Sequence, residues 1–385
     1  MVLEPREKAE FPLEQPRNKM GELVNLVLCI GPNIAQISRK MGVPKETLRY
    51  WYKEKLLKKG FTVQAAPDFQ RLGLQRVVFL VDFNEGFKEY AEPILMAMSE
   101  LCYLHSFAKT LPENSYLIKG MVPREHIGSW AKFMEELSSM GFFTIREFSI
   151  YDRVRNVPMR GDIYDFDGER WDYEWSARRM YPEGAKDDAA LMGSFDQVDL
   201  QIIMQLEQDA NRSLSDMQEN LKINYKTLTW HYRQHVLGKG LLRGYKINWM
   251  GTRYDFELDK AMHRKHTYLS VEMFGRDLEP NEKMELRGAM NSTPFLWMEA
   301  EGERSYDAQL FFPLESIPDA MKFLGDAFVS LRKKVSWFIL DQSHGITYTI
   351  APGLYDEPSK NWSFDQKRLL EKFQHLLLEI RGAGN

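Results

Sequence analysis

The sequence predicts an α+β protein built as two tandem copies of one unit, each a winged helix-turn-helix followed by a ferredoxin-like βαββαβ sandwich. The first observation is an internal repeat, in which three blocks recur in the same order at offsets that grow slowly from 180 to 191 residues. Colinear blocks of this kind indicate a tandem duplication with small insertions. The matching segments are 34–61 with 214–241, 122–137 with 312–327, and 164–171 with 355–362.

The second observation is the helical spacing inside the first block. A short apolar pattern (Ile34, Ile37, Met41) is broken at Gly42, and a second helix then carries Leu48, Tyr52 and Leu56 at intervals of four. This spacing aligns one face for burial, and a helix pair with a tight turn followed by strand-like segments is typical of a winged helix. In the second copy the break is at Lys222, and the stripe is Leu228, Tyr232 and Val236.

The third observation is the order of elements after each winged helix. The segment 68–83 runs into a strand, and then follow a helix, two strands, a second helix near 124–140 and a final strand. That order is the β-α-β-β-α-β pattern of a ferredoxin-like sandwich. The expected divisions are a first winged helix at 1–64, a first sandwich at 65–150, an acidic, aromatic extension at 151–192, a second winged helix at 193–250, a second sandwich with its extension at 251–362, and a C-terminal amphipathic helix at 363–385.

Composition excludes several classes of protein. With 44% hydrophobic and 13% aromatic residues in 385, the chain has ample material for packed cores and is not a disordered protein. No run approaches eighteen apolar residues and the first twenty residues contain no apolar signal core, so we expect a cytoplasmic protein without a membrane partner. Two cysteines form neither a disulfide framework nor a zinc–cysteine cluster.

The charge distribution points to nucleic acid more than the net charge of −4 does. Eight basic and two acidic residues lie between Arg39 and Lys59, and seven basic and two acidic residues lie between Arg212 and Lys246. Lysine and arginine on a recognition helix contact phosphates and guanine edges, so we predict double-stranded DNA as the partner. A basic, solvated face that serves only protein contacts, as in an adaptor, is the alternative. The predicted DNA contacts are Lys45, Thr47, Arg49, Tyr50 and Lys53 in copy one and Tyr225, Lys226, Thr227, Thr229, Trp230 and Arg233 in copy two.

A winged helix followed at once by this sandwich resembles the leucine-responsive regulatory protein/AsnC family of prokaryotic, especially archaeal, transcription regulators. The similarity lies in "DLQIIMQLEQDANRSLSDMQENLKI", in the wing "GLLRGYKI" and in the hinge "LGLQRVVFLVDF". The resemblance implies dimerisation through the sandwiches, here as a pseudo-dimer within one chain that reads two non-identical half-sites, and further homo-oligomers by the same surface. Half-sites of such dimers are spaced by about 34 Å or a multiple of it.

The sequence departs from the family pattern at two places. Both copies carry one extra residue between the apolar stripe of the recognition helix and the glycine that ends it. The family's "G-x-y-D" turn, which lies near its amino-acid effector site, is "ENSYLI" (113–118) in copy one, without Gly or Asp. Copy two keeps Tyr306 and Asp307, so the resemblance implies effector binding there.

No catalytic residues, cofactor or metal site are expected from motifs. The pair His263-x-x-His266 has no cysteine or paired carboxylates nearby. An enzymatic alternative stays open because siroheme decarboxylases resemble the same architecture. Their His-Cys-Tyr strand and W-P-Y-N-L-Y turn are resembled only faintly by "LCYLHSF" (101–107) and "PENSYLI" (112–118), which lack the Trp and the matching His. We interpret the 151–192 extension as structural cover of the fold, with a ligand-binding role as the alternative.

Overall fold

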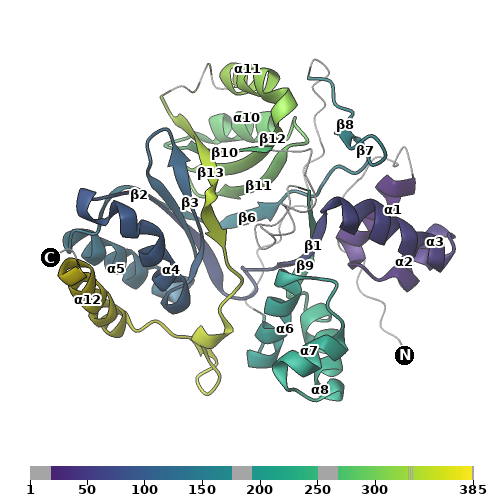
Figure 1. Cartoon of the computed structure of the whole chain (residues 1–385), viewed down its shortest axis with the longest axis horizontal. Coiled ribbons are helices and arrows are strands. Elements are labelled where there is room, and N and C mark those ends of the chain that lie inside the picture. Colours follow the sequence, from purple (N-terminus) through teal and green to yellow (C-terminus); the bar gives the residue numbers. More distant parts are fainter. Residues whose placement is uncertain are drawn as a thin grey trace.

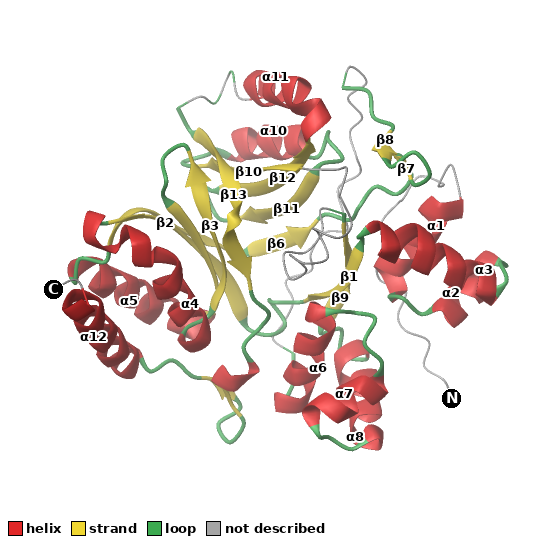
Figure 2. Cartoon of the chain, in the orientation of Figure 1, coloured by secondary structure: helices red, strands yellow, loops and turns green. Residues whose placement is uncertain are grey.

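The computed structural model describes residues 19–175, 193–249, 268–327, 329, 331 and 333–383. It contains two copies of a helical module and two copies of a helix-covered sheet, so the predicted fold class is confirmed (Figures 1 and 2). No helix in these ranges has the length and apolarity needed to cross a membrane. His263 and His266 lie outside the described residues.

The two helical modules have the same element order. The turn inside each helix-turn-helix follows a residue with a left-handed backbone, Gly42 (φ 63°) in copy one and Lys222 (φ 56°) in copy two. This conformation ends the preceding helix as expected for an αL cap. Copy one consists of α1 (Lys19–Ile30), α2 (Ile34–Met41), α3 (Lys45–Tyr50), η1 (Trp51–Leu56), η2 (Leu57–Lys59) and β1 (Thr62–Pro67). Copy two consists of α6 (Gln197–Gln208), α7 (Leu214–Leu221), α8 (Tyr225–Trp230), η5 (His231–Leu237) and β9 (Leu242–Asn248).

Both recognition helices change from α to π geometry in their second half. The π segments η1 and η5 begin directly after α3 and α8. A π turn closes i→i+5 hydrogen bonds and so accommodates an added residue without breaking the helix. The extra residue that the sequence shows in both copies is therefore absorbed inside the recognition helix, where it leaves the apolar stripe in register: Leu48, Tyr52 and Leu56 are all buried.

The wing strands pair with each other across the two copies. β1 and β9 form a two-stranded antiparallel sheet in which Thr62 is opposite Asn248 and Ala65 is opposite Tyr245. Each strand alone would present an unpaired edge, and pairing the two edges satisfies their backbone groups. The two modules are thus tied together by backbone hydrogen bonds as well as by the chain.

Each sandwich follows the predicted βαββαβ order. The first consists of β2 (Leu74–Phe83), α4 (Ala91–Leu101), β3 (Leu104–Leu111), β4 (Tyr116–Pro123), α5 (Ile127–Ser139) and β5 (Phe143–Tyr151). The second consists of β10 (Tyr268–Gly275), α10 (Pro280–Met290), β11 (Leu296–Glu301), β12 (Tyr306–Pro313), α11 (Ile317–Ala327) and β13 (Val335–Thr347). The helices lie outside, on the faces that the two sheets turn away from each other (Figure 1).

The two sheets join into one nine-stranded sheet of order β5-β2-β4-β3-β13-β10-β12-β11-β6. The first half of β13 pairs with β10 and its second half with β3, while β6 (Arg153–Asn156), the continuation of β5, pairs with β11. The last strand of each sandwich therefore also belongs to the other sandwich. The helix-free faces pack against each other through Val78, Leu80 and Leu117 on one side and Phe274 and Leu340 on the other.

Matching hairpins follow each sandwich and lie between a helical module and the opposite sandwich. In the first, β7 (Tyr164–Asp165) and β8 (Arg170–Trp171) pack on Phe61 of the first module and on Phe295 of the second sandwich. In the second, β14 (Tyr355–Asp356) and β15 (Asn361–Trp362) pack on Phe195, and the Trp362 indole donates to the Leu72 carbonyl at 2.8 Å. The closing helix α12 (Gln366–Ala383) covers α5 through Phe373 and Phe133.

Candidate nucleic-acid interface and a histidine–aspartate cluster

The five predicted contact residues of copy one lie on the outer side of α3 and η1. Lys45, Tyr50 and Lys53 are exposed, and Tyr50 keeps 58% of its surface accessible. Thr47 and Arg49 are half-buried, and Arg49 pairs with Glu46 at 2.5 Å. None of the five belongs to the core, so the face is available to a ligand.

Internal ion pairs reduce the positive charge of this face below the count from the sequence. Lys55 pairs with Asp167 at 2.8 Å, and Lys59 pairs with Glu169 at 3.0 Å and donates to the Phe166 carbonyl. These acceptors belong to the β7–β8 hairpin. Lys45 and Lys53 keep no carboxylate within ion-pair distance among the described residues, and they are the cations free to contact phosphate.

The second recognition helix presents a different surface. Tyr225 and Trp230 are 46% and 52% exposed, and Lys226, Thr227 and Arg233 are also exposed. Thr229 is half-buried, and its hydroxyl donates to the Tyr225 carbonyl at 2.7 Å. The surface of copy two consists mainly of aromatic rings and threonine hydroxyls, whereas the surface of copy one is basic.

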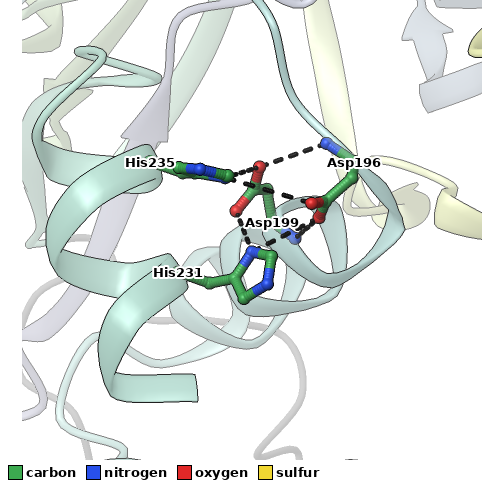
Figure 3. Close-up of side chains that lie close together, drawn as sticks. All are labelled: Asp196, Asp199, His231 and His235. Carbon is green, nitrogen blue, oxygen red and sulfur yellow. Dashed lines mark hydrogen bonds and ion pairs between the residues drawn. The ribbon is translucent and has the colours of Figure 1, made fainter. Parts of the chain in front are cut away.

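Two histidines of this recognition segment converge with two aspartates at the start of α6 (Figure 3). The Nδ1 atoms of His231 and His235 each lie 2.9 Å from an oxygen of Asp199. Asp196 adds a second carboxylate, 3.4 Å from His231 Nδ1 and 3.9 Å from His235 Nδ1. The potential ligand atoms of the four side chains all lie within 4.8 Å of one another.

Helix capping explains the position of the aspartates but not of the histidines. Asp196 accepts a hydrogen bond from the backbone N–H of Asp199, and Asp199 accepts one from the backbone N–H of Asp196, which forms a reciprocal capping box. Asp199 is fully buried beneath the two imidazoles. The Trp230 ring lies over both histidines, with centroid distances of 4.9 and 4.4 Å.

Sequence reasoning missed this cluster because it considered only His263 and His266. The available signal was a His-x3-His spacing on a helix, which places both rings on one side. It also included an Asp-x-x-Asp pair that begins another helix, 32 residues before the first histidine.

The predicted effector residues lie in the second sandwich without access to solvent. The Tyr306 hydroxyl donates to Glu299 at 2.6 Å, and Asp307 accepts from Arg76 at 2.7 Å. Both side chains are fully buried. Effector binding at Tyr306 and Asp307 stays a prediction, and it requires that these contacts open.

Asp307 belongs to a charged network between the two sheets. Arg76 and Lys119 of the first sandwich contact Glu272 of the second at 3.4 and 2.5 Å. Burial, followed by the neighbouring Asp307, raises the pKa of the Glu272 carboxyl. Burial lowers the pKa of Lys119, and Glu272 acts against that shift.

His105, on β3, packs its ring against Phe69 at a centroid distance of 5.5 Å. Burial and the nearby cations Lys246, Arg76 and Lys119 lower its pKa to about 3, so the ring is neutral at physiological pH. Of the segments that resemble siroheme decarboxylases, Cys102 is buried at the end of α4, and the Tyr103 hydroxyl donates to the Ser363 carbonyl.

Comparisons with known proteins support the fold. No protein-family model matches the sequence, and no curated protein matches it. Among solved structures, the chain is similar to the siroheme decarboxylase NirDL, with 11% identity and a TM-score of 0.51 over 93% of this chain and all of that one. The same enzyme in complex with an iron-uroporphyrin III analogue gives 11% identity and a TM-score of 0.49 over 96% of this chain and all of that one. The protein PH0061 gives 15% identity and a TM-score of 0.31 over 42% of this chain and all of that one.

Proposed function

We propose that this chain is a sequence-specific transcription regulator that binds double-stranded DNA as an intrachain pseudo-dimer. The observation that carries the proposal is that none of the eleven predicted contact residues is buried. Lys45 and Lys53 in copy one are free of carboxylate partners among the described residues. In copy two, Lys226 and Arg233 likewise have no carboxylate partner within the part of the chain that the structure describes.

The two faces differ in chemistry, so they favour different sequences. Lysine and arginine in copy one suit guanine edges and phosphates, whereas the threonines and aromatic rings of copy two suit thymine methyls and sugar edges. The preferred operator is therefore two non-identical half-sites.

Salt dependence of binding tests the proposal. Genomic fragments selected on the intact protein should yield an enriched site, and the logarithm of affinity should fall linearly with the logarithm of salt concentration. Lys53→Ala and Arg233→Ala should each reduce that slope by about one. Lys322→Ala, on exposed α11, is the matched control and should leave the slope unchanged. A lack of enrichment, or equal slopes for all variants, would favour an adaptor without DNA.

A siroheme decarboxylase-like enzyme is the second candidate. The fold comparison supports it more directly than it supports a regulator, because the tandem structure that matches over nearly the whole chain is such an enzyme. Burial and the cations Lys246, Arg76 and Lys119 keep His105 neutral, so its ring can hydrogen-bond a carboxylated substrate in an electropositive region. Siroheme mixed with the protein under anaerobic conditions should then change its absorption and release CO2, and His105→Ala should abolish both effects.

A further inference from the structure

We propose that Asp196, Asp199, His231 and His235 bind one divalent transition-metal ion, for which Zn²⁺ is the best match. The proposal requires neither DNA binding nor the decarboxylase alternative, although the site adjoins Trp230 of the predicted DNA-binding face. Imidazole nitrogen and carboxylate oxygen are common ligands of zinc in four-coordinate sites. The four side chains come from two elements only, the start of α6 and the π segment η5.

The spacing of the ligand atoms fits a tetrahedral ion. Metal–ligand bonds of 2.0–2.1 Å place neighbouring ligands about 3.3 Å apart at tetrahedral angles. The four nitrogen–oxygen distances of 2.9, 2.9, 3.4 and 3.9 Å lie on either side of that value. These distances involve both oxygens of each aspartate, and one ligand atom from each of the four side chains can be chosen so that all four lie within 4.8 Å of one another. Binding of one ion therefore requires the four side chains to close in around it.

The charge of the cluster also favours a cation. The site holds two carboxylates close together, and Asp199 has no contact with solvent. Buried charges are stable when they are paired or coordinate a metal. A divalent ion would balance the charge of both carboxylates.

The duplicated unit shows that the fold itself does not require these histidines. The repeat places Trp51 and Lys55 of copy one at the positions of His231 and His235. Lys55 there pairs with Asp167 of the hairpin, and the π segment forms without any imidazole. The two histidines are therefore specific to copy two. They face two aspartates whose positions are fixed by the capping box of α6.

A bound ion would fix the second recognition helix to the start of α6. Trp230 stands over both imidazoles and is half exposed, so the ion would also hold the aromatic part of that face. The spectroscopic consequence is that a paramagnetic ion at the site lies next to this indole and quenches its fluorescence.

The intact chain, stripped of metal with a chelator, should be titrated with Zn²⁺ by calorimetry and with Co²⁺ by visible absorption. Asp196→Asn keeps an N-cap residue but removes the carboxylate, and His235→Gln keeps a hydrogen-bond donor for Asp199. His375→Gln, on the exposed side of α12, is the control for adventitious histidine binding.

We expect one Zn²⁺ per chain in the wild type and in His375→Gln, with binding weakened about 100-fold or more in the two site variants. Co²⁺ should give the intense visible bands of four-coordinate geometry, and its quenching should be reduced in Trp230→Phe. Wild-type binding that is equally tight in His235→Gln or Asp196→Asn would overturn the proposal, as would a wild type that binds no Zn²⁺. Circular dichroism checks that both site variants fold. If one of them does not fold, the zinc affinity of the other is enough to test the proposal.

Discussion

The carboxyl group of Glu207 provides the sharpest test of how the second helical module is docked. Glu207 is buried on α6, and its Oε2 atom accepts a hydrogen bond from the backbone N–H of Ile350 at 2.9 Å. Burial raises the pKa of this carboxyl from its ordinary 4.5 to about 7, although Lys246 and the Ile350 hydrogen bond act against the shift. Replacing it with glutamine keeps an acceptor for Ile350 and removes the titration.

The size of the effect follows from the pKa. A tenfold change in proton affinity is worth about 1.4 kcal/mol, so a pKa that moves from 4.5 to about 7 corresponds to about 3 kcal/mol. Because the folded state holds the proton more tightly, the stabilisation is complete below pH 4.5 and is lost as the pH rises through 7. The free energy of unfolding of the wild type should therefore fall by about 3 kcal/mol across this window.

Urea unfolding followed by circular dichroism at several values between pH 4.5 and 8.5 measures the effect. Glu207→Gln should lose most of this pH dependence and be more stable than the wild type at pH 8. Glu219→Gln, an exposed substitution on the neighbouring α7, should keep the wild-type profile. If the free energies of unfolding of Glu207→Gln and of the wild type change in parallel with pH, the Glu207 carboxyl is not the group responsible for the pH dependence.

Three further predictions concern the junction and the hairpins. Arg76→Met should lower the free energy of unfolding by about 3–5 kcal/mol, because it leaves Asp307 and Glu272 buried with less positive charge. Urea unfolding measures this loss, and a loss under about 1 kcal/mol would contradict the prediction. Since the pKa of His105 is lowered when folded, protonation favours unfolding below pH 6.5; His105→Asn should lose less stability in acid, and identical acid unfolding curves would argue against it. Phe61→Ala should cost about 3–5 kcal/mol in thermal or urea unfolding and Lys55→Ala less than about 1. Equal losses would contradict the prediction, because the ion pair would then contribute as much as the aromatic contact.

The periodic elements could be predicted from sequence because their causes are local. Apolar residues four apart specify Leu48, Tyr52 and Leu56 as one buried face whether the helix is α or π. The extra residue was visible by comparison with the pattern of the resembled family, but its accommodation as a π turn depends on how the helix packs. Pairing of β1 with β9 was not predictable from either strand, because it depends on the position of the other copy.

The charged face shows a different limit of the sequence. Counting lysines between residues 39 and 59 overestimates the charge offered to DNA, since Lys55 and Lys59 are bound by a hairpin more than one hundred residues later. The histidine–aspartate cluster was missed for the same reason. The aspartate pair and the histidine pair lie in separate segments, and neither pair alone indicates a site. They form a cluster only when α6 packs against η5.

The strand pairs that join the two copies allow their sequences to diverge while the copies stay attached to each other. Strand pairs β3–β13, β6–β11 and β1–β9 all cross between the copies, so each half is held by backbone hydrogen bonds that any sequence with compatible strands can make. Side chains outside these strands are then free to change in one copy only. The recognition helices have done so: the position of Lys55 docks a hairpin in copy one, and its counterpart His235 joins the aspartate cluster in copy two. A homodimer cannot make this distinction, because any substitution would appear in both halves. Fusion into one chain is therefore the step that lets the exposed faces of the two helices acquire different chemistry.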